Sequence, residues 1–198
     1  MSIVVEHEKR QREILEKALD VFIDEGYENA TFQKIADRCA ITRTTLYLYF
    51  RNKKEIFNYS IKQLLGKVEK DILDVKENQE LNYREKITAV LLVILERLEE
   101  SRRLLSVILK FLLNLSQNDV CPDNRVRRRT VRLRHILATM VIEGIRAGEI
   151  DPINVRAADD LLYGIIEAAI FRLVVLKRTS VGELKHSAAL AVGQLKTP

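Results

Sequence analysis

The residues that end helices and build tight turns are scarce in this sequence. Its 198 residues include only 7 glycines, 3 prolines and no tryptophan. Because strands are joined by turns rich in Gly, Pro and Asn, this scarcity argues against a sheet. Leu, Glu, Lys, Arg and Ala, which favour helices, dominate instead. We therefore expect an all-α fold of about nine helices.

Cysteine is also rare, with Cys39 and Cys121 far apart in the chain. No Cys-x-x-Cys or Cys/His spacing accompanies them, so we expect no structural metal site and no cofactor. Two free thiols are the simpler interpretation, and a disulfide between them is the alternative.

A long apolar run is missing as well. The longest stretch, residues 161–176, is interrupted by Glu167 and Arg172 and is shorter than the roughly 20 residues that a membrane span needs. The N-terminal residues lack the apolar core and the cleavage site of a signal peptide. We expect a cytoplasmic chain without a membrane partner.

Constellations that carry catalysis are absent too. The sequence offers no nucleophile–base set, no glycine-rich phosphate loop and no metal-binding cluster. Its three histidines, His7, His135 and His186, are scattered along the chain. We therefore expect that the protein is not an enzyme.

Positive charge, in contrast, is present and placed locally. The net charge of +5 permits an anionic partner without demanding one. Residues 38–54 hold five basic side chains and no acidic one, whereas residues 6–28 are rich in carboxylates. The basic stretch is therefore the candidate contact with an anionic partner.

Helical periodicity and capping residues predict two short helices next to this basic stretch. A first helix over 8–25 is expected to end at Gly26, because glycine favours the position after a helix. Two short helices, 31–39 and 43–50, then follow with a break of three to four residues, which is the helix-turn-helix pattern. Their expected N-caps are Thr31 and Thr42.

A polar stretch over 76–82 divides the predicted helices into two domains, residues 8–68 and residues 76–198. A fourth helix carries apolar residues as far as Ile72. Capping boxes are expected at two helix starts, Asn52 with Glu55 and Ser180 with Glu183. A loop is expected over 119–124. The longer helices of the second domain are expected over 83–100, 102–118, 125–147, 155–177 and 181–195.

The polar side chains of the helix-turn-helix have chemistry that suits DNA. Apolar residues such as Ile35, Ala36 and Leu46 would hold the two helices together, leaving the polar ones outside. Arg43 can donate two hydrogen bonds to the edge of a guanine. Tyr47, Tyr49 and Lys53 each have an alternative to a DNA contact: the tyrosines could pack in the core, and the lysine could be solvated surface. Further candidates for base edges or phosphates are Gln33, Thr44, Thr45, Tyr47, Tyr49 and Lys53.

Several residues in this part of the chain also recur at fixed spacing in a known family. They are Ile14-Leu15, Ala18, Phe22, Gly26-Tyr27, Thr31, Ile35-Ala36, Ile41-Thr42, Thr45-Leu46-Tyr47, Tyr49-Phe50, Lys53 and Glu55. With them, the stretch from Ile14 to about Lys67 resembles the DNA-binding domain of tetracycline-repressor (TetR) family regulators. One departure is Ala40, where the family usually has glycine. A left-handed backbone would cost alanine about 1 kcal/mol there, although the turn need not demand it.

The resemblance implies a recognition helix over 43–50 that enters the major groove of double-stranded DNA. It implies base-facing roles for Gln33, Arg43, Thr44 and Leu48. It implies phosphate contacts for Thr31, Thr45, Tyr47, Tyr49 and Lys53. It also implies that the second domain binds a small-molecule effector and forms a homodimer.

Residues of the second domain are assigned to these roles from their position and polarity. The stretch 161–176 is apolar almost all round, so we expect one side to pack against a second copy of the chain, with burial inside one subunit as the alternative. The predicted dimer interface is Leu161, Ile165, Leu184, Ala188, Ala191 and Leu195. The predicted effector pocket is Phe111, Asn114, Leu115, Met140, Tyr163 and Glu167.

Three features of this domain carry explicit alternatives. Phe111 and Met140 could be plain core. Glu167 in an apolar helix needs a partner such as Arg172 or a bound cation. A cluster of arginines is expected to be solvated surface, or else to face an anionic effector; its members are Arg125, Arg127, Arg128, Arg129, Arg132 and Arg134.

Taken together, these features predict a sequence-specific, dimeric DNA-binding transcriptional regulator. The expected mode is a repressor that a small-molecule effector releases from a near-palindromic operator. A ligand-free architectural DNA-binding protein, which would lack a pocket, is the alternative.

Overall fold

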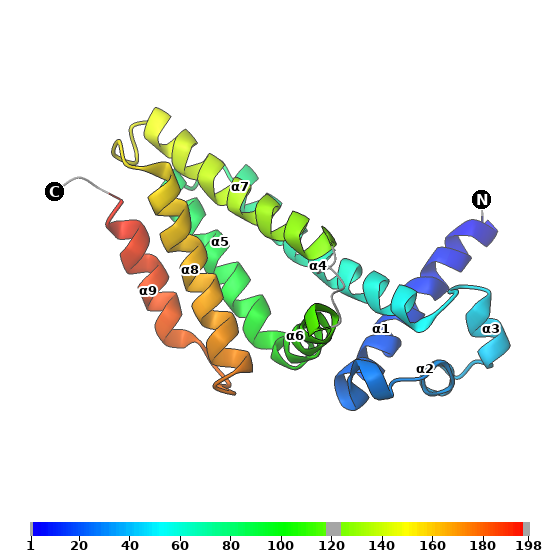
Figure 1. Ribbon diagram of the computed structural model, residues 1–198. Helices are drawn as coiled ribbons and strands as arrows, with labels where there is room; N and C mark the ends of the chain where they lie inside the picture. The colour runs from blue at the N-terminus through cyan, green and yellow to red at the C-terminus, as the bar shows by residue number, and fades with distance from the viewer. Residues whose placement is uncertain (1, 118–123, 196–198) are drawn as a thin grey trace. The chain divides into compact units, whose positions relative to one another are not determined.

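The computed structural model describes residues 2–117 and 124–195, without the side chains of residues 2–5, 64, 114–117, 124–127 and 129. The described part of the chain contains nine helices and no strand (Figure 1). This agrees with the all-α expectation. The helices are α1 (Ser2–Asn29), α2 (Phe32–Cys39), α3 (Arg43–Tyr47), α4 (Lys53–Glu77), α5 (Tyr83–Glu100), α6 (Arg102–Gln117), α7 (Asn124–Arg146), α8 (Val155–Val174) and α9 (Gly182–Gly193).

The chain divides into two compact units. The N-terminal unit comprises Met1–Lys67 together with Val107–Phe111, and the C-terminal unit comprises Val68–Ser106 with Leu112–Pro198. Helices α4 and α6 therefore contribute residues to both units.

The N-terminal unit is built on helix α1 and an aromatic cluster. Helix geometry in α1 is interrupted at Gly26, whose φ of 78° is readily adopted only by glycine, so the predicted stop lies at the predicted residue. The helix begins earlier than expected, at Ser2. Beyond the interruption, the Tyr27 ring lies 4.9 Å from Phe57 and 4.3 Å from Phe111 of α6. This cluster fastens α1, α4 and one turn of α6 together.

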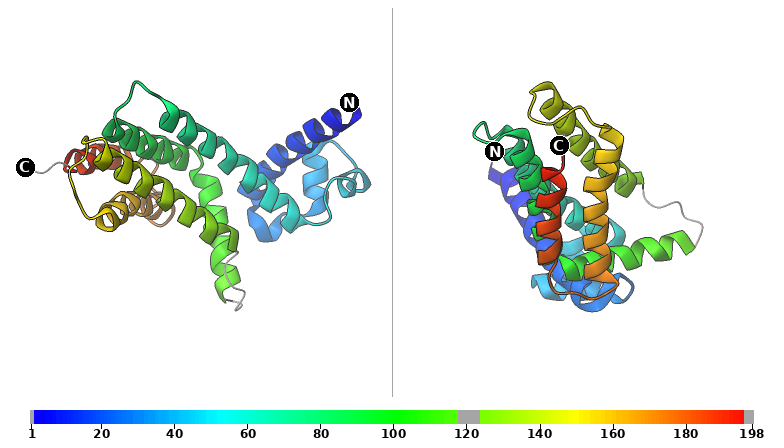
Figure 2. Two further views of the ribbon diagram at one scale, coloured as in Figure 1. Left: turned by 90° about the horizontal axis from the view of Figure 1, so that it is seen from above. Right: turned by 90° about the vertical axis from the view of Figure 1, so that its left-hand side faces the viewer.

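The C-terminal unit is a helical bundle in which α5 packs against α7, α8 and α9. Helices α8 and α9 lie side by side in two views (Figures 1 and 2). Gly144 of α7 allows a close approach, because a Cβ atom there would lie 2.6 Å from Ile150 Cδ1 and 2.9 Å from Tyr83 Cβ. Tyr83 also donates its backbone N–H to Glu149 Oε2 at 2.6 Å. The end of α7 and the start of α5 are thereby joined.

Most predicted N-caps are confirmed, whereas neither predicted capping box is complete. Thr31 and Asn52 accept backbone hydrogen bonds at the start of α2 and α4 as expected, but the Glu55 carboxylate accepts from Arg51 N instead of Asn52 N. At α9 the N-cap is Val181 without a side-chain cap; Ser180 accepts from Gly182 N, and Glu183 pairs with Arg172 instead of completing a capping box.

Two further expectations are affected by the observed bounds. Helix α3 ends at Tyr47, three residues earlier than expected, and the chain continues through tight turns to Phe50. Asn124 begins α7, whereas the rest of the predicted loop over 119–124, including Cys121, lies outside the described residues.

Candidate nucleic-acid interface

Helix α2 buries one face and exposes the other. Its N-cap, Thr31, accepts a hydrogen bond from Lys34 N at 3.2 Å, which fixes the first turn. Ile35 and Ala36 are fully buried, whereas Gln33 is exposed and donates through Nε2 to Asp37 Oδ1 at 2.7 Å. The predicted base-facing amide is therefore on the surface and already oriented.

The turn between α2 and α3 adopts a left-handed backbone at Ala40. Its φ and ψ are 55° and 43°, a region that glycine occupies at less cost than alanine. Ile41 N donates to Ala36 O at 3.0 Å and closes the turn. The turn therefore requires a left-handed backbone at Ala40, a conformation that alanine adopts at a cost. Next to it, burial raises the pKa of the Cys39 thiol, which keeps that group protonated.

Helix α3 is short and firmly capped. Thr42 accepts from Thr45 N at 3.0 Å, and the hydroxyls of the two threonines lie 2.8 Å apart. Leu46 is fully buried and anchors the helix, while Arg43, Thr44 and Leu48 are exposed. Leu48 has 75% of its surface exposed, which suits an apolar contact with a thymine methyl.

Arg43, Tyr47 and Phe32 form a row across the two helices. Arg43 donates through Nη2 to the Tyr47 hydroxyl at 3.1 Å, with its guanidinium 5.6 Å from the centre of the same ring. The Tyr47 ring stacks on Phe32 of α2, with centroids 4.6 Å apart. Arg43 is therefore held by a contact that reaches back to α2.

Tyr49 and Lys53 have different surroundings. The half-buried Tyr49 ring stacks on His7 of α1 at 4.6 Å. Lys53 donates through Nζ to the carbonyls of Tyr27 and Glu28 at 2.8 and 3.1 Å, and lies 4.5 Å from the Tyr27 ring centre. The ammonium thus satisfies the C-terminal carbonyls of α1. Burial, followed by the charge of Glu28, raises the pKa of the Tyr27 phenol.

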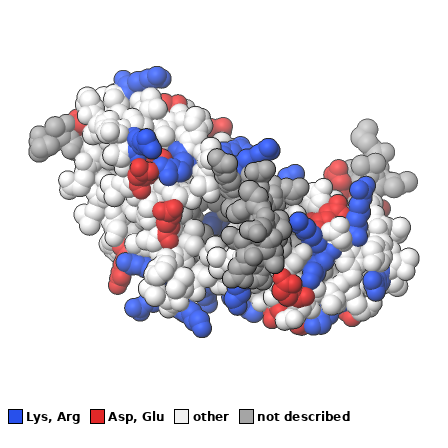
Figure 3. All heavy atoms as spheres, viewed as in Figure 1, with Lys and Arg blue, Asp and Glu red and all other residues white. Residues whose placement is uncertain are grey.

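Charge on this unit is mixed, as the interspersed basic and acidic side chains in Figure 3 show. Carboxylates of α1 pair with two bases of α2: Lys34 with Glu25 at 2.8 Å and Arg38 with Asp24 at 3.2 Å. The side chains of Arg51 and Lys54, just after α3, are exposed. Both residues belong to the basic stretch 38–54, but the sequence prediction gave them no DNA contact. Their position beside α3 was the signal that could have identified them.

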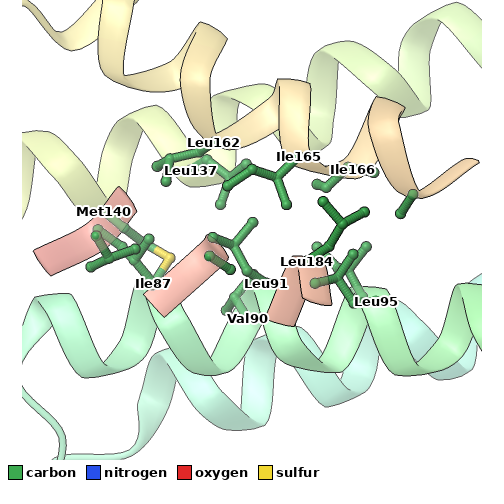
Figure 4. Close-up of a cluster of buried hydrophobic side chains, with 14 of the residues drawn as sticks. Ile87, Val90, Leu91, Leu95, Leu137, Met140, Leu162, Ile165, Ile166 and Leu184 are labelled. Atoms are coloured by element: carbon green, nitrogen blue, oxygen red, sulfur yellow. The ribbon is translucent and has the colours of Figure 1, made fainter. Parts of the chain in front are cut away.

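Four of the six predicted pocket residues have described side chains, and they belong to different surroundings. Phe111 belongs to the aromatic cluster of the N-terminal unit, and Met140 is fully buried in the core of the other (Figure 4). Tyr163 is half-buried beneath the Arg134 guanidinium at 5.3 Å, while Glu167 is exposed and needs no partner. The side chains of Asn114 and Leu115 lie outside the described residues. The four described side chains thus have different surroundings, and the predicted pocket stays a prediction.

The arginines of α7 also divide. Arg134 donates to the buried Asp159 at 2.8 Å and to Asp160, and these two hydrogen bonds raise its pKa above the ordinary value. Arg132 lies 3.6 Å from Glu69, and Arg128 is exposed. The side chains of Arg125, Arg127 and Arg129 lie outside the described residues. Elsewhere in this unit, a groove of about 330 Å³ lies between α4 and α5, lined by Asp71, Asp74, Val93, Glu96, Arg97 and Glu100.

Burial changes the expected interface between copies. Ile165, Leu184, Ala188 and Leu195 are at most 8% exposed and pack in the core of a single chain, so their side chains have little surface left for a partner. Within one chain, α8 and α9 pack on α5 through the stripe that carries these residues, so their role between copies stays a prediction. Leu161 remains half-exposed, and Ala191 is partly buried.

An exposed apolar surface lies on α8 and α9 instead. The spacing of Leu161, Phe171 and Val175 places them along one side of α8, together with Gly164 and Ala168. We define the outer α8–α9 surface by Leu161, Phe171, Val175, Leu176 and Leu190, each at least half exposed. The three- and four-residue spacing along α8 was the signal from which this surface could have been found.

The described residues contain neither a metal-ligand cluster nor a membrane-spanning helix. No group of three or more His, Cys, Asp or Glu side chains there could hold a metal ion. No helix in residues 2–117 and 124–195 is long and apolar enough to cross a membrane.

Comparisons with known proteins agree on one family. The model described as "Bacterial regulatory proteins, tetR family" matches residues 14–59, which contain α2 and α3. The chain is 28% identical over 160 residues, 80% of either chain, to the "Fatty acid metabolism regulator protein" of Bacillus subtilis.

Solved structures agree with the fold. A TetR transcription regulator from Haloarcula marismortui superimposes with a TM-score of 0.79 at 22% identity, covering 95% of this chain and 96% of that one. The transcriptional regulator FadR from Bacillus subtilis, in complex with stearoyl-CoA, superimposes with a TM-score of 0.71 at 24% identity, covering 94% and 97%.

Proposed function

The chain belongs to the TetR family of DNA-binding transcriptional regulators, and we propose that it is a dimeric repressor that a small-molecule effector releases from a near-palindromic operator. The observation that carries the proposal is the exposed face of α2 and α3. There, Gln33, Arg43, Thr44 and Leu48 lie on the surface, whereas Ile35, Ala36 and Leu46 are buried between the helices.

The side chains of this face divide by their chemistry. Arg43 can donate two hydrogen bonds to guanine, the Gln33 amide can donate to and accept from adenine, and Leu48 can make an apolar contact with a thymine methyl. These residues read bases together with Thr44. Thr31, Thr45 and Tyr49 offer hydroxyls to phosphates. To them we add Arg51 and Lys54, whose exposed cations can neutralise phosphates. Lys53 acts differently, because its ammonium already binds the carbonyls of α1.

A second copy of the chain supplies the second recognition helix. The outer α8–α9 surface is apolar and at least half exposed, which favours a partner of the same kind. A two-fold dimer contacts two half-sites separated by about one helical turn or a multiple of it. The operator is therefore expected to be a near-palindrome.

A fatty acyl-CoA is the effector class that we propose. The support is the relative that regulates fatty acid metabolism and the similar fold that binds stearoyl-CoA. The exposed Arg128 on α7 offers a cation for the phosphates of such a ligand. The acidic groove between α4 and α5 would repel those phosphates. Coupling between effector and DNA would amount to about 1–3 kcal/mol and would be reciprocal.

The operator is tested by selecting bound duplexes from a random DNA pool at fixed near-physiological salt, followed by sequencing. We expect enrichment of a near-palindrome. Failure to enrich any sequence with protein that has been unfolded and refolded to strip ligand would contradict the proposal, because a bound effector could then no longer explain the result.

The effector is tested on the protein–operator complex. Stearoyl-CoA should release the operator, whereas free coenzyme A and stearate should do so less, because each carries only part of the ligand. Arg128→Glu should weaken the response, and Arg146→Glu, at an exposed position in the last turn of the same helix, is the matched control. Retention of the operator at saturating stearoyl-CoA would rule out this effector class.

A further inference from the structure

In the proposed function, Arg43 reads a guanine, and contacts within the free protein restrict the position of its side chain. A free arginine side chain samples many rotamers, and ordering it on binding opposes association. Here the guanidinium already donates from Nη2 to the Tyr47 hydroxyl at 3.1 Å, one helical turn away. The free protein therefore holds Arg43 before DNA arrives.

The group that holds it is itself fixed. Tyr47 is nearly half exposed, so its own burial does not fix its ring. The ring instead stacks on Phe32 of α2, with centroids 4.6 Å apart and planes inclined by 28°. Phe32 is half-buried next to the N-cap of α2. Through Tyr47, the position of α2 therefore helps to fix the position of Arg43 on α3.

We propose that Tyr47 is a positioning residue that presents Arg43 for reading a base, with Phe32 as its support. This inference rests on the proposed function, in which Arg43 reads a guanine. It gives Tyr47 a different role from the phosphate contact that the family resemblance implies.

The hydrogen-bond inventory of arginine agrees with this role. A guanidinium has five N–H donors, and the contact with Tyr47 engages one donor atom, Nη2. The remaining donors suffice for two parallel hydrogen bonds to O6 and N7 of guanine. The tyrosine oxygen, as acceptor, restricts the guanidinium plane without occupying the groups that read the base.

The two roles predict different losses when the hydroxyl is removed. A hydroxyl that only contacts phosphate strengthens binding to every sequence, so its loss weakens all duplexes by the same factor. A hydroxyl that positions Arg43 strengthens binding to the preferred base pair alone. Its loss therefore reduces discrimination at that pair.

The experiment measures affinity for the selected operator and for a series of operators with single base-pair changes, at fixed salt. Tyr47→Phe keeps the ring and its stacking on Phe32 but removes the hydroxyl. Tyr49→Phe is the matched control, because it removes the hydroxyl of a tyrosine whose ring stacks on His7 of α1. Arg43→Ala identifies the base pair that Arg43 reads. Circular dichroism confirms that each variant is folded.

We expect Arg43→Ala to reduce discrimination at one base pair of each half-site by about five-fold or more. Tyr47→Phe should reduce discrimination at the same pair by about two- to ten-fold, the effect of one hydrogen bond. In the Arg43→Ala background, Tyr47→Phe should have no further effect on that pair. Tyr49→Phe should leave discrimination unchanged.

A uniform loss of affinity across all operators in Tyr47→Phe, or an unchanged base preference, would overturn the positioning role while leaving Arg43 as the reader. If Arg43→Ala leaves every base preference intact, the base-reading assignment of the proposed function fails, and the role of Tyr47 fails with it. Phe32→Leu gives a second check, because it keeps an apolar side chain but removes the stacked ring. Phe32→Leu should reduce discrimination at the same base pair as Tyr47→Phe does.

Discussion

The two units of this protein present opposite kinds of surface. In the N-terminal unit, the exposed residues of α2 and α3 are mostly polar and are held by short-range contacts, such as Gln33 with Asp37 and Arg43 with Tyr47. In the C-terminal unit, α8 and α9 expose large apolar side chains, such as Phe171 and Leu190. The first surface suits a polar, anionic partner, and the second suits another copy of the chain. This contrast supports the proposal that DNA reading and assembly belong to different units.

The largest expected effect concerns the core of the C-terminal unit. Leu162 is fully buried in the cluster of α5, α7 and α8, so Leu162→Ala should lower the free energy of unfolding by about 2–5 kcal/mol. Urea denaturation at one protein concentration measures the change. Leu73→Ala, at an exposed position of α4, is the control and should change stability by about 0.5 kcal/mol or less. Equal losses in the two variants would contradict the assigned core.

The next effect concerns assembly through the outer α8–α9 surface. Phe171, with 54% of its surface exposed, should become buried between copies, so Phe171→Ala should weaken dimerisation by about 2 kcal/mol or more. Sedimentation analysis measures the dissociation constant. Val131→Ala removes an exposed apolar side chain from α7 and should leave it unchanged. A dimer as tight as the original in Phe171→Ala would place the interface elsewhere.

A smaller effect separates structural from DNA-binding lysines. Lys53→Met should lower stability by about 1 kcal/mol, because two carbonyls of α1 lose a donor, and should change the salt dependence of DNA binding little. Lys54→Met should have little effect on stability and should lower the slope of log affinity against log salt by about 0.9 per subunit. If Lys53→Met lowered the salt slope and Lys54→Met lowered stability instead, Lys53 would be the residue that contacts phosphate.

The smallest expected effect has the opposite sign. Ala40→Gly should raise stability by about 0.5–1 kcal/mol, because glycine adopts the left-handed backbone of this turn without strain. Ala189→Gly, at an exposed position inside α9, should lower stability by a similar amount. A loss of stability in both variants, measured by thermal or urea unfolding, would argue against strain at Ala40.

The sequence predicts the helices well, because periodicity and capping are local. Thr31, Thr42 and Asn52 each accept the backbone hydrogen bond that their residue type favours. The exception is Ser180, where the chain enters α9 through Val181. A capping motif is only a preference, and here the buried Val181 side chain determines how the helix begins.

The candidate sites of the two units also differ in how far the sequence predicts them. The exposed residues of α2 and α3 follow from one short motif, since the buried Ile35 and Leu46 fix which side chains face outward. The partners of these residues are tertiary, as Lys53 with the end of α1 and Tyr47 with Phe32 demonstrate. In the C-terminal unit, helical spacing identified apolar stripes but not what each stripe faces. Leu184 and Met140, for example, pack in the core of their own chain, a tertiary contact that spacing alone does not reveal.

In the proposed function, the outward face of α2 and α3 selects the DNA sequence. Replacing Gln33, Arg43 and Thr44 together with alanine and repeating the selection from the random DNA pool tests this role. We expect a folded dimer that retains weak, salt-dependent binding and enriches no sequence. Enrichment of the same near-palindrome as the unaltered protein would contradict it, because the specificity would then reside in another part of the chain.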